Sequence, residues 1–317
     1  DSVYSLEPLS SIKSVVFNLV INPTYAGKDL KGLDNLQTVG SLQIGQIKNL
    51  KSADFPKLEA VMTNLIINGA WVESVNFPEL KTVDKGLQIQ NTDYLLEMSF
   101  PKLQKVIENM AVQGSWSVNR LKAIDFPSLE KIGGNLNMTQ WNEATRISLP
   151  SLKNVVAFSV TSFPKMTSLN APKLESASIR LENVILENMD GLKSLASIGN
   201  ELFISNMSEL KSSKGLKALT SVGGRIYISN WLKLEDDIEG LSSLSQVGGD
   251  IILYQIPFKK FSGFSLSQAK KISLFGDNLT TIQEIDLRNI TLTGLQLTNI
   301  LTPFTLKGKD VCDYDVS

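Results

Sequence analysis

The sequence predicts an all-β solenoid, a parallel β-helix of about twelve coils, from three observations that recur together. A leucine returns every 21–26 residues, a valine or isoleucine follows most of these leucines three residues later, and a short alternating apolar–polar run comes after a turn. Alternation over short runs bounded by glycine or proline is typical of β-strands. We therefore expect each repeat to form one coil of stacked strands.

The repeated leucine ends one of two short blocks. Phe-Pro-x-Leu, with variants beginning Leu-Pro and Ala-Pro, occupies residues 55–174, and Gly-Leu-x-x-Leu occupies 32–36 and then 191–244. The change of block near residue 190 marks two sub-arrays on one axis. The leucines are Leu36, Leu58, Leu80, Leu103, Leu129, Leu152, Leu174, Leu195, Leu219 and Leu244, with weaker copies at Ile12 and Leu266.

The alternating run, such as Leu87-Gln88-Ile89, predicts a strand with two apolar side chains facing inward and one facing outward. One coil cannot bury an apolar face alone, so neighbouring coils must stack and form a parallel sheet. The outward positions then form a row across the coils. This row is predicted to contain Gln43, Ile66, Gln88, Asn137, Ser159, Phe203, Tyr227 and Ile252.

The alternative architecture is a leucine-rich-repeat horseshoe, whose pattern overlaps this one. Asn91, Asn206 and Asn230 follow strands as that pattern requires, but the residues expected for a convex helix are mostly missing. No linker divides the chain, which predicts a single solenoid over residues 1–317. Within it we expect an N-terminal cap coil at 1–31, regular coils at 32–254, and a C-terminal cap and tail at 255–317.

Composition argues against several classes of function. Lysine and arginine total 31 against 32 aspartate and glutamate, so there is no basic field for nucleic acid, and no apolar run is long enough for a membrane span. Histidine is absent and catalytic motifs are missing, so we expect no enzyme, no cofactor and no metal. The alternative enzyme is a polysaccharide-active β-helix with two carboxylates, for which Asp236, Asp237 and Glu239 are candidates.

Aromatic residues supply the candidate binding residues. The four tryptophans, Trp71, Trp116, Trp141 and Trp231, all come three or four residues after the main strand. They are interpreted either as corner packing or as an edge that stacks on sugar rings. Phe203, Tyr227 and Ile252 form an apolar strip on adjacent coils, either a partner site or a surface covered by a neighbouring segment.

The Gly215–Asn230 segment, with its Gly-Leu-x-x-Leu-x-x-Val-Gly-Gly-x-Ile-x-Ile-x-Asn pattern, resembles the receptor L-domain repeat of growth-factor receptors. The Phe-Pro coils are most similar to the fungal cell-wall organisation glycoproteins of that superfamily. The resemblance implies a secreted, right-handed β-helix that is N-glycosylated and held by a glycosylphosphatidylinositol lipid anchor. It also implies terminal cysteine pairs, of which only Cys312 has a counterpart here.

The resemblance implies that the four N-x-Ser/Thr sequons are glycosylation sites. They lie at Asn137, Asn206, Asn278 and Asn289. The predicted function is a non-enzymatic glycoprotein of the cell wall or outer cell surface. It would serve cell-wall organisation as a structural or binding scaffold, with a cell-wall glycan or a surface protein as partner. A second alternative is a receptor-like domain that binds a protein ligand.

Overall fold

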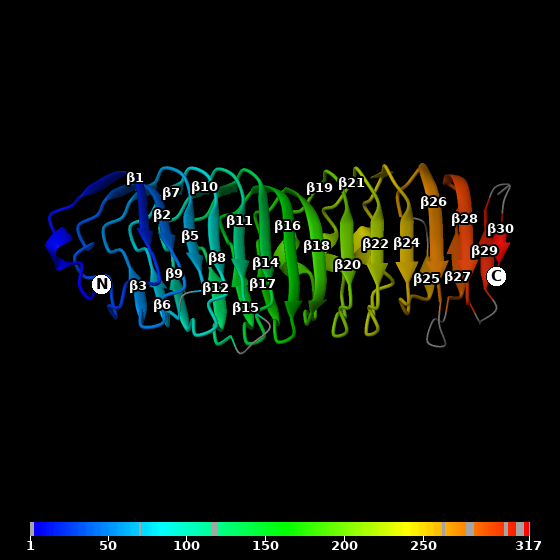
Figure 1. Ribbon diagram of the computed structural model, residues 1–317. Coiled ribbons are helices and arrows are strands. Elements are labelled where there is room, and N and C mark those ends of the chain that lie inside the picture. Colours follow the sequence, from blue (N-terminus) through cyan, green and yellow to red (C-terminus); the bar gives the residue numbers. More distant parts are fainter. Residues whose placement is uncertain are drawn as a thin grey trace. The chain divides into compact units, whose positions relative to one another are not determined.

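Parallel strands, joined by turns and stacked on the strands of neighbouring coils, are the main regular elements of the computed structural model (Figure 1). The structure describes residues 3–69, 71–115, 119–261, 264–276, 282–300, 304–308 and, for the backbone alone, 314–316. The chain divides into two compact units, Asp1–Ala171 and Pro172–Ser317. The two units together contain about twelve coils, as the leucine period predicts, and the single array over 1–317 stays a prediction.

The first unit is built on one long parallel ladder. Each strand pairs with the strand of the next coil in unbroken order, as Leu42, Leu65 and Leu87 do. The ladder consists of β1 (Ser14–Ile21), β2 (Thr38–Ile44), β5 (Leu65–Asn68), β8 (Leu87–Gln90), β11 (Met110–Gln113), β14 (Asn135–Thr139) and β16 (Asn154–Phe163). Shorter strands precede it in the coils, namely β4 (Ala60–Val61), β7 (Thr82–Val83), β10 (Lys105–Val106) and β13 (Lys131–Ile132).

Besides the long ladder and the shorter strands that precede it, each coil of this unit has a third side, which carries the Phe-Pro blocks. Its strands form two short parallel sheets, β3 (Ser52–Asp54), β6 (Ser74–Asn76) and β9 (Glu97–Ser99), and β12 (Ala123–Asp125), β15 (Arg146–Ser148) and β17 (Ser168–Asn170). A buried phenylalanine follows each of β3, β6, β9 and β12, whereas Leu149 and Ala171 follow β15 and β17. Phe55, Phe77 and Phe100 stack with ring centroids 5.1 Å apart, and Phe126 follows at 5.5 Å.

The second unit repeats the long ladder with a different third side. The ladder consists of β18 (Ser176–Val184), β20 (Leu202–Ser205), β22 (Ile226–Ser229), β24 (Ile251–Tyr254), β26 (Gln268–Phe275), β28 (Thr291–Thr298) and β30 (Tyr314–Val316). Shorter strands are β19 (Ser197–Ile198), β21 (Ser221–Val222) and β23 (Gln246–Val247). The Gly-Leu blocks form 3-10 helices, η2 (Asp190–Leu192), η3 (Lys214–Leu216) and η4 (Glu239–Leu241), and later coils return to strands, β25 (Lys260–Phe261), β27 (Glu284–Asp286) and β29 (Thr305–Lys307).

The β-helix prediction is confirmed. Within the described ranges there is no α-helix, and the helical turns are 3-10 helices of three residues each, of which η1 (Glu7–Leu9) belongs to the first coil. The convex helices of a horseshoe are therefore not formed in these residues. The ten spaced leucines from Leu36 to Leu244 are all fully buried.

The two ends differ from each other. At the N-terminal end, Ile12 is only half-buried and β1 exposes Val16, Phe17 and Val20. A bulge between Val15 and Asn18 interrupts the register of β1, a device that protects an edge strand from further pairing.

The expected C-terminal cap is wrong for residues 268–298, which form two further coils. Ile272 and Leu295 continue the buried row of Ile251 in register, although the Gly-Leu block is absent.

Candidate binding surface

The outward row of the second unit forms an aromatic ridge, defined here as Arg180, Phe203, Tyr227 and Ile252. These residues pair in register on four successive strands. The Phe203 and Tyr227 rings stack with centroids 5.0 Å apart and planes 10° apart, and the Arg180 guanidinium lies 4.0 Å from the centroid of Phe203. Because each ring face lies against its neighbour, the ridge presents ring edges to its surroundings.

Polar rows run on both sides of the aromatic ridge. On one side Arg225 donates from Nε to the Glu201 carboxylate of the preceding coil. On the other side the Ser205 and Ser229 hydroxyls are buried and lie 2.8 Å apart, so they satisfy each other. The ridge therefore has an exposed charged row on the Arg225 side, as at the rim of a recognition surface, and a buried hydroxyl pair on the other side.

The outward row of the first unit has a different character. Gln43, Ile66, Gln88, Ala111, Asn137 and Ser159 pair in sequence along the ladder, as the period predicts. Most of these side chains carry amide or hydroxyl groups. The exposed Asn137 lies between the small Ala111 and Ser159, which leaves room for a bulky modification.

The tryptophans do not form one strip. Trp71 is 45% exposed, whereas Trp141 and Trp231 are fully buried, so the assignment of these last two to a binding face is wrong. The physical reason is a difference of one residue. Trp141 and Trp231 come three residues after the last inward side chain of their strand, at a position that faces the core, and Trp71 comes four residues after Ile67. Trp116 lies outside the described residues.

Sequence reasoning missed two residues beside Trp71. Tyr94 stacks on Trp71 with ring centroids 5.1 Å apart, and the Arg120 guanidinium lies 5.9 Å from the Tyr94 centroid on the next coil. Tyr94 is 38% exposed. The interval from Leu103 to Leu129, which contains Arg120, is the longest in the array, but nothing in the spacing around Tyr94 marks that residue.

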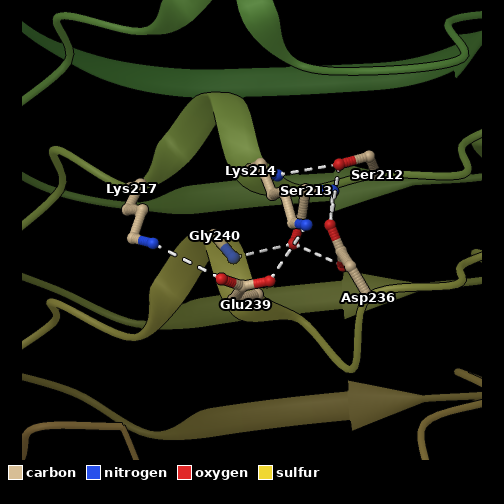
Figure 2. Close-up of polar contacts among 7 residues, drawn as sticks. All are labelled: Ser212, Ser213, Lys214, Lys217, Asp236, Glu239 and Gly240. Atoms are coloured by element: carbon tan, nitrogen blue, oxygen red, sulfur yellow. Dashed lines mark hydrogen bonds and ion pairs between the residues drawn. The ribbon is translucent and has the colours of Figure 1, made fainter.

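The acidic group that suggested hydrolysis is a hydrogen-bonded corner (Figure 2). The Asp236 carboxylate accepts from Ser212 Oγ at 2.8 Å, from the Ser213 backbone N–H at 2.6 Å and from Ser213 Oγ at 2.9 Å. The Gly240 N–H donates to Ser213 Oγ at 2.9 Å. Asp237 accepts from the Lys259 N–H at 2.5 Å. Asp236 and Asp237 therefore hold neighbouring coils together.

Glu239 completes this corner as a charge partner of two lysines. Its carboxylate lies 3.2 Å from Lys214 Nζ and 3.3 Å from Lys217 Nζ. The hydrogen bonds from Lys214 and then Lys217 lower the pKa of Glu239. A general acid for glycoside hydrolysis needs a raised pKa, so this geometry favours a structural role for the group.

The described sequons differ in their surroundings. Asn137 and Asn289 are exposed, and Asn289 follows a strand in a turn. Asn206 has a left-handed backbone conformation, with φ of 56°, and belongs to an amide ladder. Its Nδ2 donates to Asn183 at 2.9 Å and its Oδ1 accepts from Asn230 at 2.6 Å, so a glycan on Asn206 would crowd this ladder. Asn278, like Cys312, lies outside the described residues.

A shallow groove of about 680 Å³ crosses the second unit between neighbouring coils. Its lining is mostly serine and glycine, including Ser197, Gly199, Ser221 and Gly223, and it contains no ionisable side chain. Among the residues that the structure describes, no group of histidine, cysteine, aspartate and glutamate is placed to hold a metal ion. No helix in the same residues is long and apolar enough to cross a membrane.

The fold and surfaces define the class as a parallel β-solenoid with repeats of 21–26 residues. No protein-family model matches the chain, and no curated protein matches it significantly. Among solved structures, the chain is similar to a leucine-rich repeat protein from Bacteroides ovatus. The two are 13% identical with a TM-score of 0.27, over 93% of this chain and 84% of that chain.

Proposed function

We propose that this protein is a non-enzymatic binding scaffold that recognises its partner through the aromatic ridge. The observation that carries the proposal is the in-register stack of Arg180, Phe203 and Tyr227 beside the exposed Glu201–Arg225 pair. Large rigid side chains beside an arginine are enriched where binding energy concentrates. The carboxylates considered for catalysis are instead engaged in bonds between coils.

The finer proposal is a secreted glycoprotein of the cell wall or outer cell surface that serves cell-wall organisation. Support comes from the resemblance of the repeats to fungal cell-wall proteins and from the exposed sequons at Asn137 and Asn289. The intact mass of the protein secreted by its native source tests this proposal. Added hexose and N-acetylhexosamine mass is expected, and a mass equal to that of the bare chain would contradict it.

A protein ligand is the second candidate partner, favoured by the composition of the ridge. Ring edges and Ile252 provide an apolar centre, whereas the charged row through Glu201 and Arg225 provides the rim found at protein interfaces. The first candidate partner is a cell-wall polysaccharide, which is insoluble, and the second is a protein that can be extracted from the cell surface. Binding to the two can therefore be measured separately.

The role of the ridge can be tested by measuring how much purified chain is retained on two materials from the source cells. One is isolated wall polysaccharide and the other is immobilised surface-protein extract. The double substitution Phe203→Ser and Tyr227→Ser is expected to lower retention at least tenfold, a loss of roughly 1.4 kcal/mol of binding free energy. Leu232→Ser is the matched control, because Leu232 is an exposed apolar residue of the same unit away from the ridge. Equal retention of both variants would contradict the proposal.

A further inference from the structure

A second surface lies in the first unit, at the corner that follows the long ladder. Trp71, Tyr94 and Arg120 come from three successive coils and stack in that order. Tyr94 is covered on both faces, by Trp71 and by the guanidinium. Trp71 is the end of the stack and is 45% exposed.

Polar side chains surround the exposed end of this stack. The Trp71 backbone N–H donates to the Ile47 carbonyl at 3.3 Å, so residues 46–49 of the preceding coil run beside Trp71. Gln46, Lys48 and Asn49 in that segment are all exposed. Hydrogen-bond donors and acceptors therefore lie on the coil beside Trp71.

The coil that carries Tyr94 also breaks the pattern of the core. Thr92 is fully buried at the position, three residues after the last inward strand residue, that Ile47, Trp141, Met207 and Trp231 occupy in other coils. Neither Thr92 Oγ1 nor the buried Asp93 Oδ1 has a hydrogen-bond partner. Buried polar atoms without partners are rare and call for a functional explanation or a bound water.

From this arrangement we infer that the corner of Trp71, Tyr94 and Arg120 binds a neutral oligosaccharide. A pyranose ring presents an apolar C–H face, which suits contact with the exposed indole, and hydroxyl groups that both donate and accept hydrogen bonds. Complementary groups are available from Gln46 and Asn49 on the preceding coil and from Arg120 on the following one, all three exposed. A protein partner would need an apolar centre within about 800 Å² of surface on each side, and two rings provide much less than that.

This site is separate from the aromatic ridge, and it deepens the proposed scaffold function by naming a ligand class. The two can fail independently, because Trp71→Ala should leave ridge-dependent retention unchanged and the ridge variants should leave sugar binding unchanged. Each loss therefore reports on one surface alone.

The test uses tetra- to hexasaccharides of glucose, mannose and N-acetylglucosamine as probes, followed by calorimetry and tryptophan fluorescence. At least one series is expected to bind and to change the fluorescence. Trp71→Ala should weaken that binding at least tenfold and abolish the fluorescence change. Met62→Ala is the control, since Met62 is 48% exposed in the same unit, and it should bind as the wild type does.

Tyr94→Ala serves as a second variant if Trp71→Ala does not fold, with the same expected loss. No binding in any of the three series would overturn the inference. Undiminished binding by a folded Trp71→Ala or Tyr94→Ala variant would also overturn it. So would a result in which these variants lose binding only to protein from a surface extract and not to any oligosaccharide.

Discussion

The Phe-Pro coils of the first unit and the Gly-Leu coils of the second fill the same position of the repeat by different means. In the first unit a short strand leads into a phenylalanine that stacks on its neighbours, as Phe77 does between Phe55 and Phe100. In the second unit a 3-10 turn occupies this position, and a glycine lets the turns approach. A side chain on Gly215 would collide with the Met189 backbone. Neighbouring coils of the first unit are therefore in contact through large side chains, and those of the second unit through backbone that approaches closely because a side chain is absent.

Both solutions leave the following leucine in the same place. The Leu58 N–H donates to the Phe55 carbonyl at 3.3 Å, and the Leu195 N–H donates to the Leu192 carbonyl at 2.9 Å. The three-residue turn is therefore the element that both blocks share. The block before the leucine varies, provided that it completes this turn and fills the space between coils.

The largest effect is expected from removing a ring of the phenylalanine stack. Phe77→Ala deletes a fully buried ring between two stacked neighbours and should lower the free energy of unfolding by about 3–5 kcal/mol. Hydrogen exchange measured by mass spectrometry should show the loss of protection in the first unit.

Phe77→Leu is the control for that variant, because it retains much of the apolar volume and should cost less than half as much. A loss of protection that is equal in the Gly-Leu coils would mean that the stack does not act locally.

The next largest effect is expected from adding a methyl group at a position of the second unit that has no space for it. Gly215→Ala places a Cβ against the Met189 backbone and should destabilise the unit by about 1–3 kcal/mol. Gly199→Ala is a matched control, because a Cβ at Gly199 meets nothing within 4 Å. Urea denaturation of the two variants separates them, and equal midpoints would refute close approach as the reason for the Gly-Leu block.

A smaller effect should separate the two buried indoles. Trp141 Nε1 donates to the Val112 carbonyl at 3.0 Å, whereas Trp231 Nε1 has no hydrogen-bond partner. Replacing the donor of a buried bond leaves the acceptor unpaired, so Trp141→Phe should cost about 1 kcal/mol more than Trp231→Phe. Thermal denaturation of the two variants measures the difference, and the reverse order would show that packing outweighs the hydrogen bond.

The sequence was sufficient to predict the stacked coils because the core obeys two simple periods. The leucine interval and the alternation within each strand assign inward and outward positions, and the pairing of Gln43, Ile66 and Gln88 follows from them. The two C-terminal coils were missed because the leucine block is absent there. The alternation at Ile272 and Leu274 nevertheless persisted and was the better signal.

The candidate sites were less predictable, because they lie in corners whose lengths differ. A one-residue difference after the strand turns Trp71 outward and Trp141 inward. The stack of Tyr94 between Trp71 and Arg120 joins three coils, and no local pattern indicates it. The aromatic ridge was easier to find, since outward strand positions on stacked coils remain in register.

The smallest effect concerns charge, since each unit has a glutamate between two lysines. In the first unit Glu143 accepts from Lys122 and Lys165 of the neighbouring coils, and these bonds lower its pKa from 4.5 to about 2. A carboxyl whose pKa is lower in the folded state stabilises the fold above the unfolded value. That contribution is lost as the pH falls from about 4.5 to about 2.

Glu143→Gln should therefore reduce stability at pH 6 and flatten the decline between pH 4.5 and pH 2, as measured by the urea midpoint. Because these side chains are exposed, added salt should shrink the difference. Glu130→Gln is the control, since the Glu130 side chain forms no ion pair within the described part of the chain. A Glu143→Gln variant with the acid profile of the wild type would show that these ion pairs do not hold the coils together.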